Sequence, residues 1–392
     1  MLETNTVILT YSLAIAVFLA WSAGSNNAAN IVAAVVGARI IKLNKALLIT
    51  SVFVVFGSIM LGSNVAWVLS TGVINTRSTP TSLLTTGMLV AMFAAGSWVL
   101  IASLLKVPVS VNETVLAGLI GFGISVNPNI IMWQQVIIIY ILRFFTIPLS
   151  GIISFLIKKF LANYLEEPET TSPATLLSLF LVSVLITYLI LSKLLGITLG
   201  LLTALVLSTS LLVVSKVYVD EKSSNLYERI YLYRSIFSVL ILILMSLAYG
   251  ASNAGITAGP LLTILMNELG FTNEDALSIL LVFSGLLISF GIISWGKRVV
   301  GTLGEELATL NYSTAVITYL STSLTTLVLA ELGVPAATTM AVAGSIIGAS
   351  LAEGYSAVNM RIVRKMLTVW ALTTPACVAI SYVSYVLMMK IT

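Results

Sequence analysis

Long apolar runs follow one another along the chain and are separated by short polar stretches. Each run has about the ~20 residues that a helix needs to cross the hydrocarbon core of a bilayer. The runs lie near residues 7–38, 45–70, 82–105, 107–126, 130–158, 174–192, 194–217, 235–265, 277–296, 311–331, 334–354 and 366–390. The longest polar stretches, 166–173 and 220–234, are too short for a soluble domain. The pattern predicts an all-α integral membrane protein with about twelve transmembrane helices.

The composition agrees with lipid as the main solvent of the chain. Of 392 residues, 58% are hydrophobic and 9% are charged, whereas soluble domains carry roughly 25% charged residues. The net charge of +4 comes from basic residues in loops and at span ends, so we expect no nucleic-acid partner. The chain has no histidine and one cysteine, Cys377, in an apolar run. We therefore expect neither an enzyme nor a bound metal or cofactor.

Basic residues favour one set of loops, and this sets the expected orientation. Lysine and arginine follow the first, fifth, seventh and ninth runs and precede the twelfth. With twelve spans these loops share one side of the membrane, which the positive-inside rule makes cytoplasmic. Residues 1–6 carry no positive charge and the first run leads into a polar motif, so we expect a retained span rather than a signal peptide. The prediction is a multi-pass protein of the cell membrane with both termini outside.

Two pairs of motifs repeat at a nearly constant offset. Residues 24–27, Gly-Ser-Asn-Asn, resemble residues 250–253, Gly-Ala-Ser-Asn, at an offset of 226, and residues 106–110 resemble residues 333–337 at an offset of 227. Five runs lie in each repeat and two runs join them. The second repeat therefore begins five plus two runs after the first. Because this sum is odd, the second repeat should enter the membrane from the opposite side, as is typical of secondary transporters. The predicted divisions are a first inverted repeat over 1–160, two linking spans over 161–232 and a second inverted repeat over 233–392.

Amide and hydroxyl residues gather inside two runs at the first motif pair. One cluster holds Asn26, Asn27 and Asn30, and the other holds Ser252 and Asn253. Both clusters contain glycine, which predicts interrupted helices whose freed backbone groups and amides coordinate an ion or an anion. The alternative is that these side chains only join helices through hydrogen bonds.

The second motif pair places a proline shortly before several polar residues. A proline at the first helical position predicts that these residues lie in the first turn, beside unpaired N–H groups and the positive end of the helix dipole. Such a helix end suits an anion, although ordinary helix capping is the alternative. The residues are Ser110, Asn112 and Glu113 after Pro108, and Thr338 and Thr339 after Pro335.

Two charged side chains fall inside the membrane on this assignment. Glu113 lies near the start of its run, and Arg143 is flanked on both sides by apolar residues. A charge at the centre of a span costs roughly 2.5–3.5 kcal/mol on insertion scales, so it usually faces a partner or a cavity. Arg143 is therefore expected either to bind the substrate or to pair with Glu113.

Together these residues resemble the inorganic phosphate transporter family, the PiT-type permeases of phosphate and sulfate. The family's G-A-N-D-x-A-N signature corresponds to residues 24–30, and its P-V-S-T-T-H elements correspond to residues 108–113 and 335–340. The resemblance covers almost the whole chain except residues 174–230. It implies a helical membrane transporter of a tetrahedral oxyanion.

The chain departs from the family pattern at several chemically important positions. Asn27 and Asn253 stand where the family has aspartate, and Glu113 and Met340 stand where it has histidine. The aspartate and asparagine positions of the family look like sodium ligands, so the resemblance implies ion coupling there. Because an amide gives only a partial charge to a hard cation, the departures favour protons over sodium, with Glu113 as the carrier.

The expected function is symport of inorganic phosphate, driven by H+ or Na+. A sulfate permease is the main alternative, and a passive anion channel or a membrane enzyme is a weaker one. Phosphate keeps a P–OH donor at neutral pH and needs an acceptor, whereas sulfate needs donors only. The sequence leaves both substrates and a homo-oligomer open. The predicted substrate-binding residues are Asn26, Ser110, Asn112, Thr338, Thr339 and Arg143, and the predicted ion-coupling residues are Asn27, Asn30, Ser252, Asn253 and Glu113.

Overall fold

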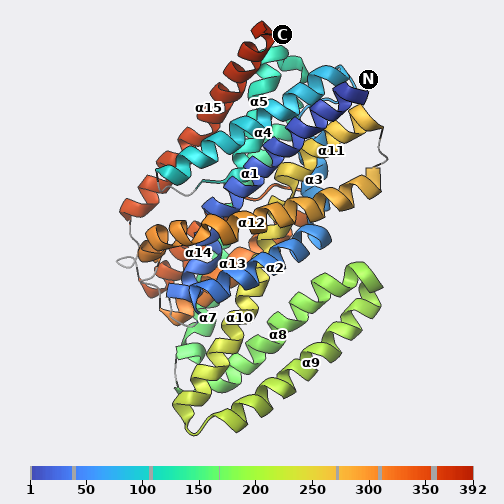
Figure 1. Ribbon diagram of the computed structural model, residues 1–392. Coiled ribbons are helices and arrows are strands. Elements are labelled where there is room, and N and C mark those ends of the chain that lie inside the picture. The colour runs from blue at the N-terminus through green and yellow to red at the C-terminus, as the bar shows by residue number, and fades with distance from the viewer. Residues whose placement is uncertain are drawn as a thin grey trace.

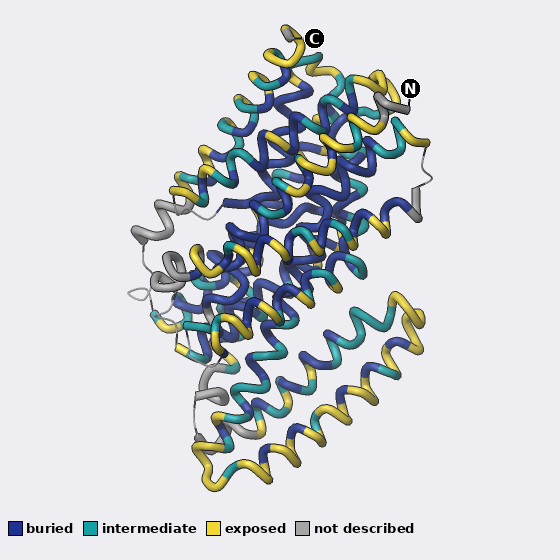
Figure 2. The backbone as a smooth tube through the Cα atoms, viewed as in Figure 1, coloured by how far each residue is buried: buried dark blue, intermediate teal, exposed yellow. Residues whose placement is uncertain are grey.

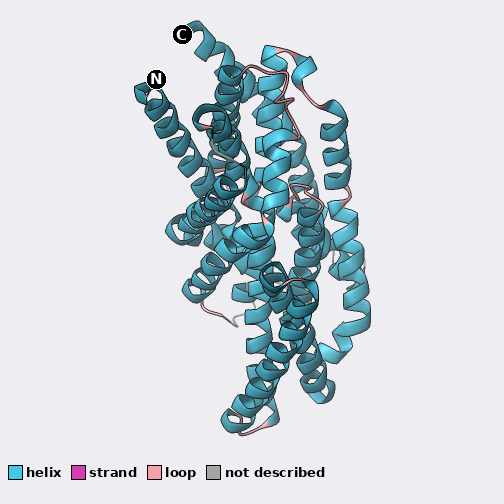
Figure 3. Cartoon of the chain, turned by 90° about the vertical axis from the view of Figure 1, so that its right-hand side faces the viewer, coloured by secondary structure: helices cyan, strands magenta, loops and turns pink. Residues whose placement is uncertain are grey.

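The protein is built from helices throughout the part of the chain that the computed structural model describes, which is residues 2–37, 41–105, 109–166, 168–270, 273–307, 311–354 and 360–391 (Figures 1 and 3). The predicted all-α class is therefore confirmed. The only β pairing among these residues is an isolated bridge between Ile74 and Ile131. The helices are α1 (Leu2–Gly37), α2 (Leu43–Leu61), α3 (Ser63–Thr71), α4 (Thr81–Leu104), α5 (Val111–Val126), the 3-10 helix η1 (Pro128–Ile130), α6 (Trp133–Phe144), α7 (Thr146–Glu166), α8 (Pro168–Leu195), α9 (Ile197–Lys222), α10 (Leu226–Asn253), α11 (Gly255–Leu269), α12 (Asn273–Leu307), α13 (Tyr312–Glu331), α14 (Thr338–Glu353) and α15 (Met360–Ile391).

Ten helical segments of the described residues are long and apolar enough to cross a membrane. The two remaining predicted spans, near 107–126 and 334–354, contain α5 and α14, which have 16 residues each. At 1.5 Å per residue these helices are roughly 24 Å long, and a hydrocarbon core is about 30 Å thick. Of the twelve predicted spans, ten are therefore found at full length among the described residues, and twelve full spans are not confirmed. The apolar runs are longer than these two helices, because they also include residues that are not helical or lie outside the described ranges.

The predicted interruption of the helices at the first motif pair is wrong for one motif. α1 continues from Leu2 to Gly37 through the cluster of asparagines. The polar side chains bond carbonyls of their own helix instead, since Ser25 donates to Trp21 at 2.7 Å and Asn27 donates to Ala23 at 3.3 Å. In the second motif the helix is interrupted only at Ala254, between α10 and α11.

The glycines of this motif pair serve close packing rather than interruption. A Cβ added to Gly24 would overlap the Ile288 carbonyl of α12, and a Cβ added to Gly250 would overlap the Val54 carbonyl of α2. Glycine therefore lets the backbones of α1 and α12, and of α10 and α2, approach closely, which is how small residues act at membrane helix interfaces.

Packing contacts repeat at the offset seen in the sequence. α5 and α14 have bounds displaced by 227 residues at both ends. α5 packs on α15, and α14 packs on α7. In the first pair a Cβ on Gly121 would overlap the Val378 carbonyl, and in the second a Cβ on Gly348 would overlap the Gly151 carbonyl, so the contact is equivalent. These matches support the internal repeat, while its inverted membrane topology stays a prediction.

α8 and α9 form an antiparallel pair that projects from the rest of the molecule (Figure 1). α8 reaches the body mainly through α10 and α7. Along α9 most residues are exposed or half-buried, in contrast to the buried middle of the body (Figure 2). Its exposed side chains are largely aliphatic, including Val206 and Val214. This pair corresponds to the predicted linking spans, and its apolar surface suits a lipid environment.

The two chain ends and the two short helices, α5 and α14, lie at different levels along the molecule. Both termini lie at the same end (Figures 1 and 3). α5 runs toward that end beside α15, whereas α14 runs away from it beside α7 (Figure 1). The two helices therefore begin near the middle of the body, where burial is greatest (Figure 2). Which side of the membrane holds the termini stays a prediction.

Candidate functional site

A buried polar cluster lies where α5 and α14 begin, against the middle of α1 and the end of α10. All eleven predicted site residues belong to it or border it. Each of them is at most 4% exposed. They are Asn26, Asn27, Asn30, Ser110, Asn112, Glu113, Arg143, Ser252, Asn253, Thr338 and Thr339. The structure thus brings together groups from both halves of the sequence in a deeply buried place.

The start of α14 contacts α1 and the segment before α5. The Thr339 hydroxyl lies 3.2 Å from Asn27 Oδ1 and 3.3 Å from the Val109 carbonyl, and it can donate to either. Asn30 Nδ2 donates to Asn27 Oδ1 at 2.9 Å and approaches the Thr339 hydroxyl oxygen at 3.2 Å. Asn27 therefore presents its side-chain oxygen to donors from two different helices.

The start of α5 makes the matching contacts in the other half. Asn112 Nδ2 donates to Asn253 Oδ1 at 3.2 Å and to the Ala336 carbonyl at 2.8 Å. Asn112 corresponds to Thr339, Asn253 to Asn27 and Ala336 to Val109, each within one residue of the 227-residue offset. Each short helix therefore bonds the asparagine of one motif and the segment that precedes the other short helix.

Further bonds tie the end of α10 to this meeting point. Asn253 Nδ2 lies within hydrogen-bond distance of the Ser252 and Thr338 hydroxyls, at 2.8 and 3.3 Å. The Tyr249 hydroxyl donates to the Ala23 carbonyl of α1 at 3.2 Å. α1 and α10 are thereby held together beside the starts of the two short helices.

Asn26 faces a different neighbour from Asn27. Its Nδ2 donates to the Ser103 hydroxyl of α4 at 2.8 Å, and its Oδ1 accepts from the Val109 N–H at 3.3 Å. In this conformation Asn26, which was predicted to bind the substrate, fixes the extended segment before α5 against α1 and α4.

Arg143, at the end of α6, crosses between the two motif segments. It donates to the Ser110 hydroxyl at 2.9 Å and to the Pro335 carbonyl at 3.0 Å, and it lies 3.5 Å from the Glu113 carboxylate. The second Glu113 oxygen accepts from Thr374 of α15 at 2.7 Å. Of the two roles left open for Arg143, the one present here is pairing with Glu113.

Capping does not account for the hydroxyls at these helix starts. Ser110 is the N-cap residue of α5, yet its side chain makes no capping bond, and the N-cap of α14 is Ala337. Pro335 is not at the first helical position, because residues 334–337 are not helical and α14 begins only at Thr338. Pro108 lies outside the described residues. At the start of α5 the Glu113 N–H donates to the Ser110 carbonyl at 3.1 Å. The first N–H groups of a helix otherwise lack an intrahelical acceptor, and both short helices begin beside the same buried cluster.

Several participants carried no clear sequence signal. Thr374 and Tyr249 were not singled out, although Thr374 directly precedes a proline within an apolar run and Tyr249 directly precedes the second glycine motif. The Pro335 and Ala336 carbonyls could not be found from residue types at all, because every residue has a carbonyl. Only the non-helical conformation of 334–337 exposes them to donors.

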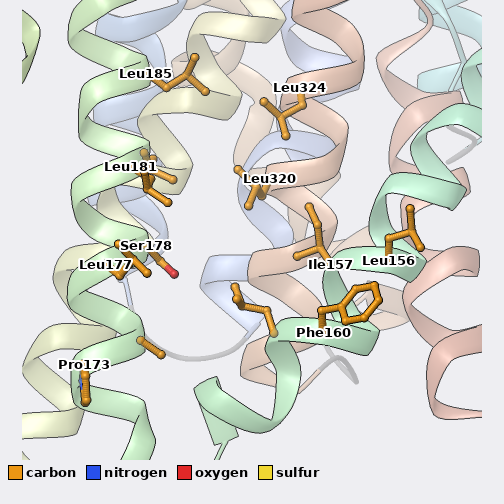
Figure 4. A pocket seen from close by; sticks show the side chains of 13 residues that line it. Leu156, Ile157, Phe160, Pro173, Leu177, Ser178, Leu181, Leu185, Leu320 and Leu324 are labelled. Atoms are coloured by element: carbon orange, nitrogen blue, oxygen red, sulfur yellow. The ribbon is translucent and has the colours of Figure 1, made fainter.

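An apolar pocket of about 890 Å³ lies elsewhere, between α7, α8 and α13 (Figure 4). Leucine side chains such as Leu177, Leu181 and Leu320 point into it, and Ser178 is the one polar residue among the described residues that line it (Figure 4). The described lining offers no charge and almost no donors, so an anion gains nothing there in exchange for its hydration. The polar cluster at the helix starts is therefore the candidate site.

The arrangement defines a class of protein. Apolar helices surround two short helices that begin in the middle of the body over a buried polar cluster, and helix ends that meet at mid-membrane also form the binding sites of membrane transporters. The chain belongs to the phosphate transporter family, whose family model matches residues 23–381.

Relatives of similar length extend the comparison. The chain is 27% identical to an inferred phosphate permease of Chlamydia muridarum, over 95% of this chain and 96% of the relative. It is 29% identical to another from Thermococcus kodakarensis, over 93% of each chain. Among solved structures it resembles "The sodium-dependent phosphate transporter" with a TM-score of 0.89 and 26% identity, over 98% of this chain and 100% of that one. The family expected from the motifs is thus confirmed.

Proposed function

We propose that the protein is a symporter that carries inorganic phosphate across the cell membrane together with a coupling ion. One observation carries the proposal: the starts of α5 and α14 meet at a buried cluster of hydroxyl and amide groups. Helix N-termini supply N–H donors and a positive dipole end to an anion. Ser110, Thr338 and Thr339 add hydroxyls beside them, and the surrounding apolar helices exclude water that would compete.

Alternating access follows from the same arrangement. We propose that the two repeats have inverted topology, which is supported by the equivalent packing of α5 on α15 and of α14 on α7. One short helix then leads from the site toward each side of the membrane. Opening the contacts around α5 would expose the site at the end that holds the termini, and opening those around α14 would expose it at the opposite end.

The coupling ion is predicted to be the proton, with Glu113 as its carrier. Glu113 is the one carboxylate among the described residues of the site, and amides stand at Asn27 and Asn253. In this conformation both carboxylate oxygens of Glu113 are engaged, one by Arg143 at 3.5 Å and the other by Thr374 at 2.7 Å. The proposed proton carrier would therefore exchange these contacts in another conformation of the transport cycle. The sodium alternative is supported by the name of the similar solved structure.

The test is uptake of labelled phosphate into proteoliposomes, with sodium and pH gradients imposed separately. We expect uptake that accumulates against a gradient, works without sodium and is driven by an inward proton gradient. In Glu113→Gln the proton drive should be lost while downhill phosphate exchange remains. Strict sodium dependence would overturn the proton assignment alone. Uptake of sulfate but no phosphate, or phosphate flux without accumulation under any gradient, would overturn the proposed symport.

A further inference from the structure

Asn112 has one polar atom more than its counterpart Thr339. Both side chains donate at equivalent places, Asn112 through Nδ2 to Asn253 Oδ1 and the Ala336 carbonyl, and Thr339 through its hydroxyl to Asn27 Oδ1 and the Val109 carbonyl. A threonine would thus suffice for these contacts. The additional atom is Asn112 Oδ1, which is buried and has no hydrogen-bond partner among the described residues.

The direction of the Asn112 amide is fixed by its neighbours. The Ala336 carbonyl can only accept, and Asn253 Oδ1 faces Asn112 because Asn253 Nδ2 is directed to the Tyr249 carbonyl at 3.0 Å and to the Ser252 and Thr338 hydroxyls. Rotating the Asn112 amide by half a turn would set oxygen against oxygen at both contacts. Oδ1 is therefore an acceptor inside the site to which no described residue donates.

A buried acceptor without a donor is unfavourable, so a ligand that brings a donor is favoured there. The residue as a whole is 1% exposed. The other acceptor in the first turn of α5, the Glu113 carboxylate, is already engaged on both oxygens by Arg143 and Thr374. The hydroxyls at the two helix starts can donate to an anion, whereas Asn112 Oδ1 can only accept. The hydrogen bond that the site lacks is therefore one to Asn112 Oδ1, and an anionic ligand that carries a single hydroxyl donor would supply it.

We infer that Asn112 Oδ1 accepts the hydrogen bond of the protonated oxygen of phosphate and so makes the site selective for phosphate over sulfate. The inference rests on the proposed function and names the group that sets its specificity. Both ionic forms of phosphate present near neutral pH keep a P–OH group, whereas sulfate would place an unprotonated oxygen against Asn112 Oδ1. A site built around a substrate hydroxyl discriminates strongly against analogues that lack it.

The neutral amide suits this role better than a carboxylate. A carboxylate would also accept from P–OH, but its charge would repel the anion. Asn112 Oδ1 accepts the proton-bearing oxygen without adding negative charge, while Nδ2 keeps the start of α5 tied to the segment before α14. Recognition of the hydroxyl and closure of the site thus use opposite ends of one side chain.

The experiment compares oxyanions that do and do not carry a hydroxyl. Arsenate resembles phosphate in keeping an –OH at neutral pH, whereas sulfate and selenate do not. Competition with labelled phosphate uptake is measured for the native protein, for Asn112→Thr, which keeps a donor and removes Oδ1, and for Asn112→Ser. Ser246→Ala is the control, because that buried hydroxyl donates only to the Leu242 carbonyl of its own helix. Phosphate-dependent thermal stabilisation in detergent gives a second readout that does not need transport.

In the native protein we expect arsenate to compete about as well as phosphate, and sulfate and selenate to compete poorly. In Asn112→Thr the apparent affinities for phosphate and arsenate should fall about ten- to a hundred-fold, whereas those for sulfate and selenate should stay unchanged. The preference for phosphate and arsenate over sulfate and selenate should therefore become smaller. Equal losses for all four anions, or an unchanged preference, would overturn the inference, as would a variant defective only in its dependence on the coupling cation. A native protein that neither binds nor transports phosphate would instead overturn the proposed function.

Discussion

The starts of α5 and α14 make equivalent hydrogen bonds at one position but differ in charge at the next. Asn112 and Thr339 make equivalent bonds to the asparagines of the first motif pair. One residue further along, Glu113 carries a buried charge at the start of α5, whereas Met340 occupies that place at the start of α14. Hydrogen bonding is therefore repeated in the two halves, but charge is not.

The same asymmetry continues in the helices behind these positions. Arg143 pairs with Glu113, and at the same offset Trp370 corresponds to Arg143. Trp370 is buried, and its Nε1 has no hydrogen-bond partner among the described residues. Arg143 also donates to the Pro335 carbonyl. A charged side chain from the first half of the sequence therefore holds the segment before α14, which belongs to the second half. The repeat supplies a symmetric set of donors, and a single ion pair ties the two segments together.

Breaking that ion pair on one side should have the largest effect. Arg143→Met leaves the Glu113 charge buried without a partner, which should lower the free energy of unfolding by about 3–5 kcal/mol and abolish transport. The double change Arg143→Met with Glu113→Met makes the start of α5 resemble that of α14 and should recover much of the stability. Thermal unfolding in detergent measures both. Arg229→Met, in an exposed pair with Asp220, is the control and should change little.

The result would discriminate between two views of the charged pair. Recovery in the double variant without recovery of uptake would mean that the pair is needed for the transport cycle rather than for folding. A single variant as stable as the native protein would contradict the burial and pairing argument.

Removing the repeated asparagines tests whether the two halves are equivalent in function. Asn27→Ala and Asn253→Ala each take away a side-chain oxygen that accepts from the opposite short helix. Both variants should insert into the membrane normally and lose uptake, because these residues line the site and not the lipid face. Asn225→Ala, which removes an exposed cap of α10, is the control. Normal uptake in both site variants would contradict the assignment.

Much of the site could be predicted because its signals are local in the sequence. Polar residues inside apolar runs have to find partners, so the clusters around Asn27, Asn253, Ser110 and Thr338 were expected to be buried, and they are. The offset between the motifs matches the clusters that the structure brings together. Arg143 lies 3.5 Å from Glu113 in this conformation, and its binding of the substrate stays a prediction.

What the sequence could not supply is geometry that depends on the backbone. Glycine in a polar motif predicts a break and close helix packing equally well, and at Gly24 the tertiary contact with Ile288 decides for packing. Apolar length does not reveal that the non-helical residues 334–337 shorten the following helix. The Pro335 carbonyl that binds Arg143 and the Thr374 hydroxyl that binds Glu113 come from distant segments, and no spacing rule connects them with the pair.

Single hydroxyl removals should have intermediate effects and show whether both helix starts contribute to binding. Ser110→Ala and Thr338→Ala each remove one hydroxyl beside a helix N-terminus. A hydrogen bond to a charged group is worth about 1.5–3 kcal/mol, so the apparent affinity for phosphate should fall roughly ten- to a hundred-fold in either variant. Concentration-dependent uptake measures it, with Ser246→Ala as the control. A loss in one variant alone would show that only one of the two helix starts meets the anion.

The smallest effect is expected at the far end of α14, where the two short helices differ again. Among the described residues α5 ends at Val126 with no ionic contact, whereas the last residue of α14, Glu353, lies 2.7 Å from Lys158 of α7. Lys158 is buried, but the Glu353 side chain is 37% exposed. Solvent screens such a carboxylate, so Glu353→Gln should cost no more than about 1 kcal/mol of stability.

The Glu353 variant should therefore bind phosphate normally while the end of α14 is held less firmly to α7. Lys158 keeps the hydroxyls of Ser313 and Thr314, at 2.5 and 3.0 Å, as acceptors. If α14 has to shift during transport, the rate of uptake should change while the apparent affinity stays constant. Glu331→Gln is the matched control, because its carboxylate lies 3.9 Å from Lys193 with both side chains exposed. A loss of stability as large as that of Arg143→Met would show that the charge asymmetry of the two halves extends along the whole of α14 and is not confined to its start.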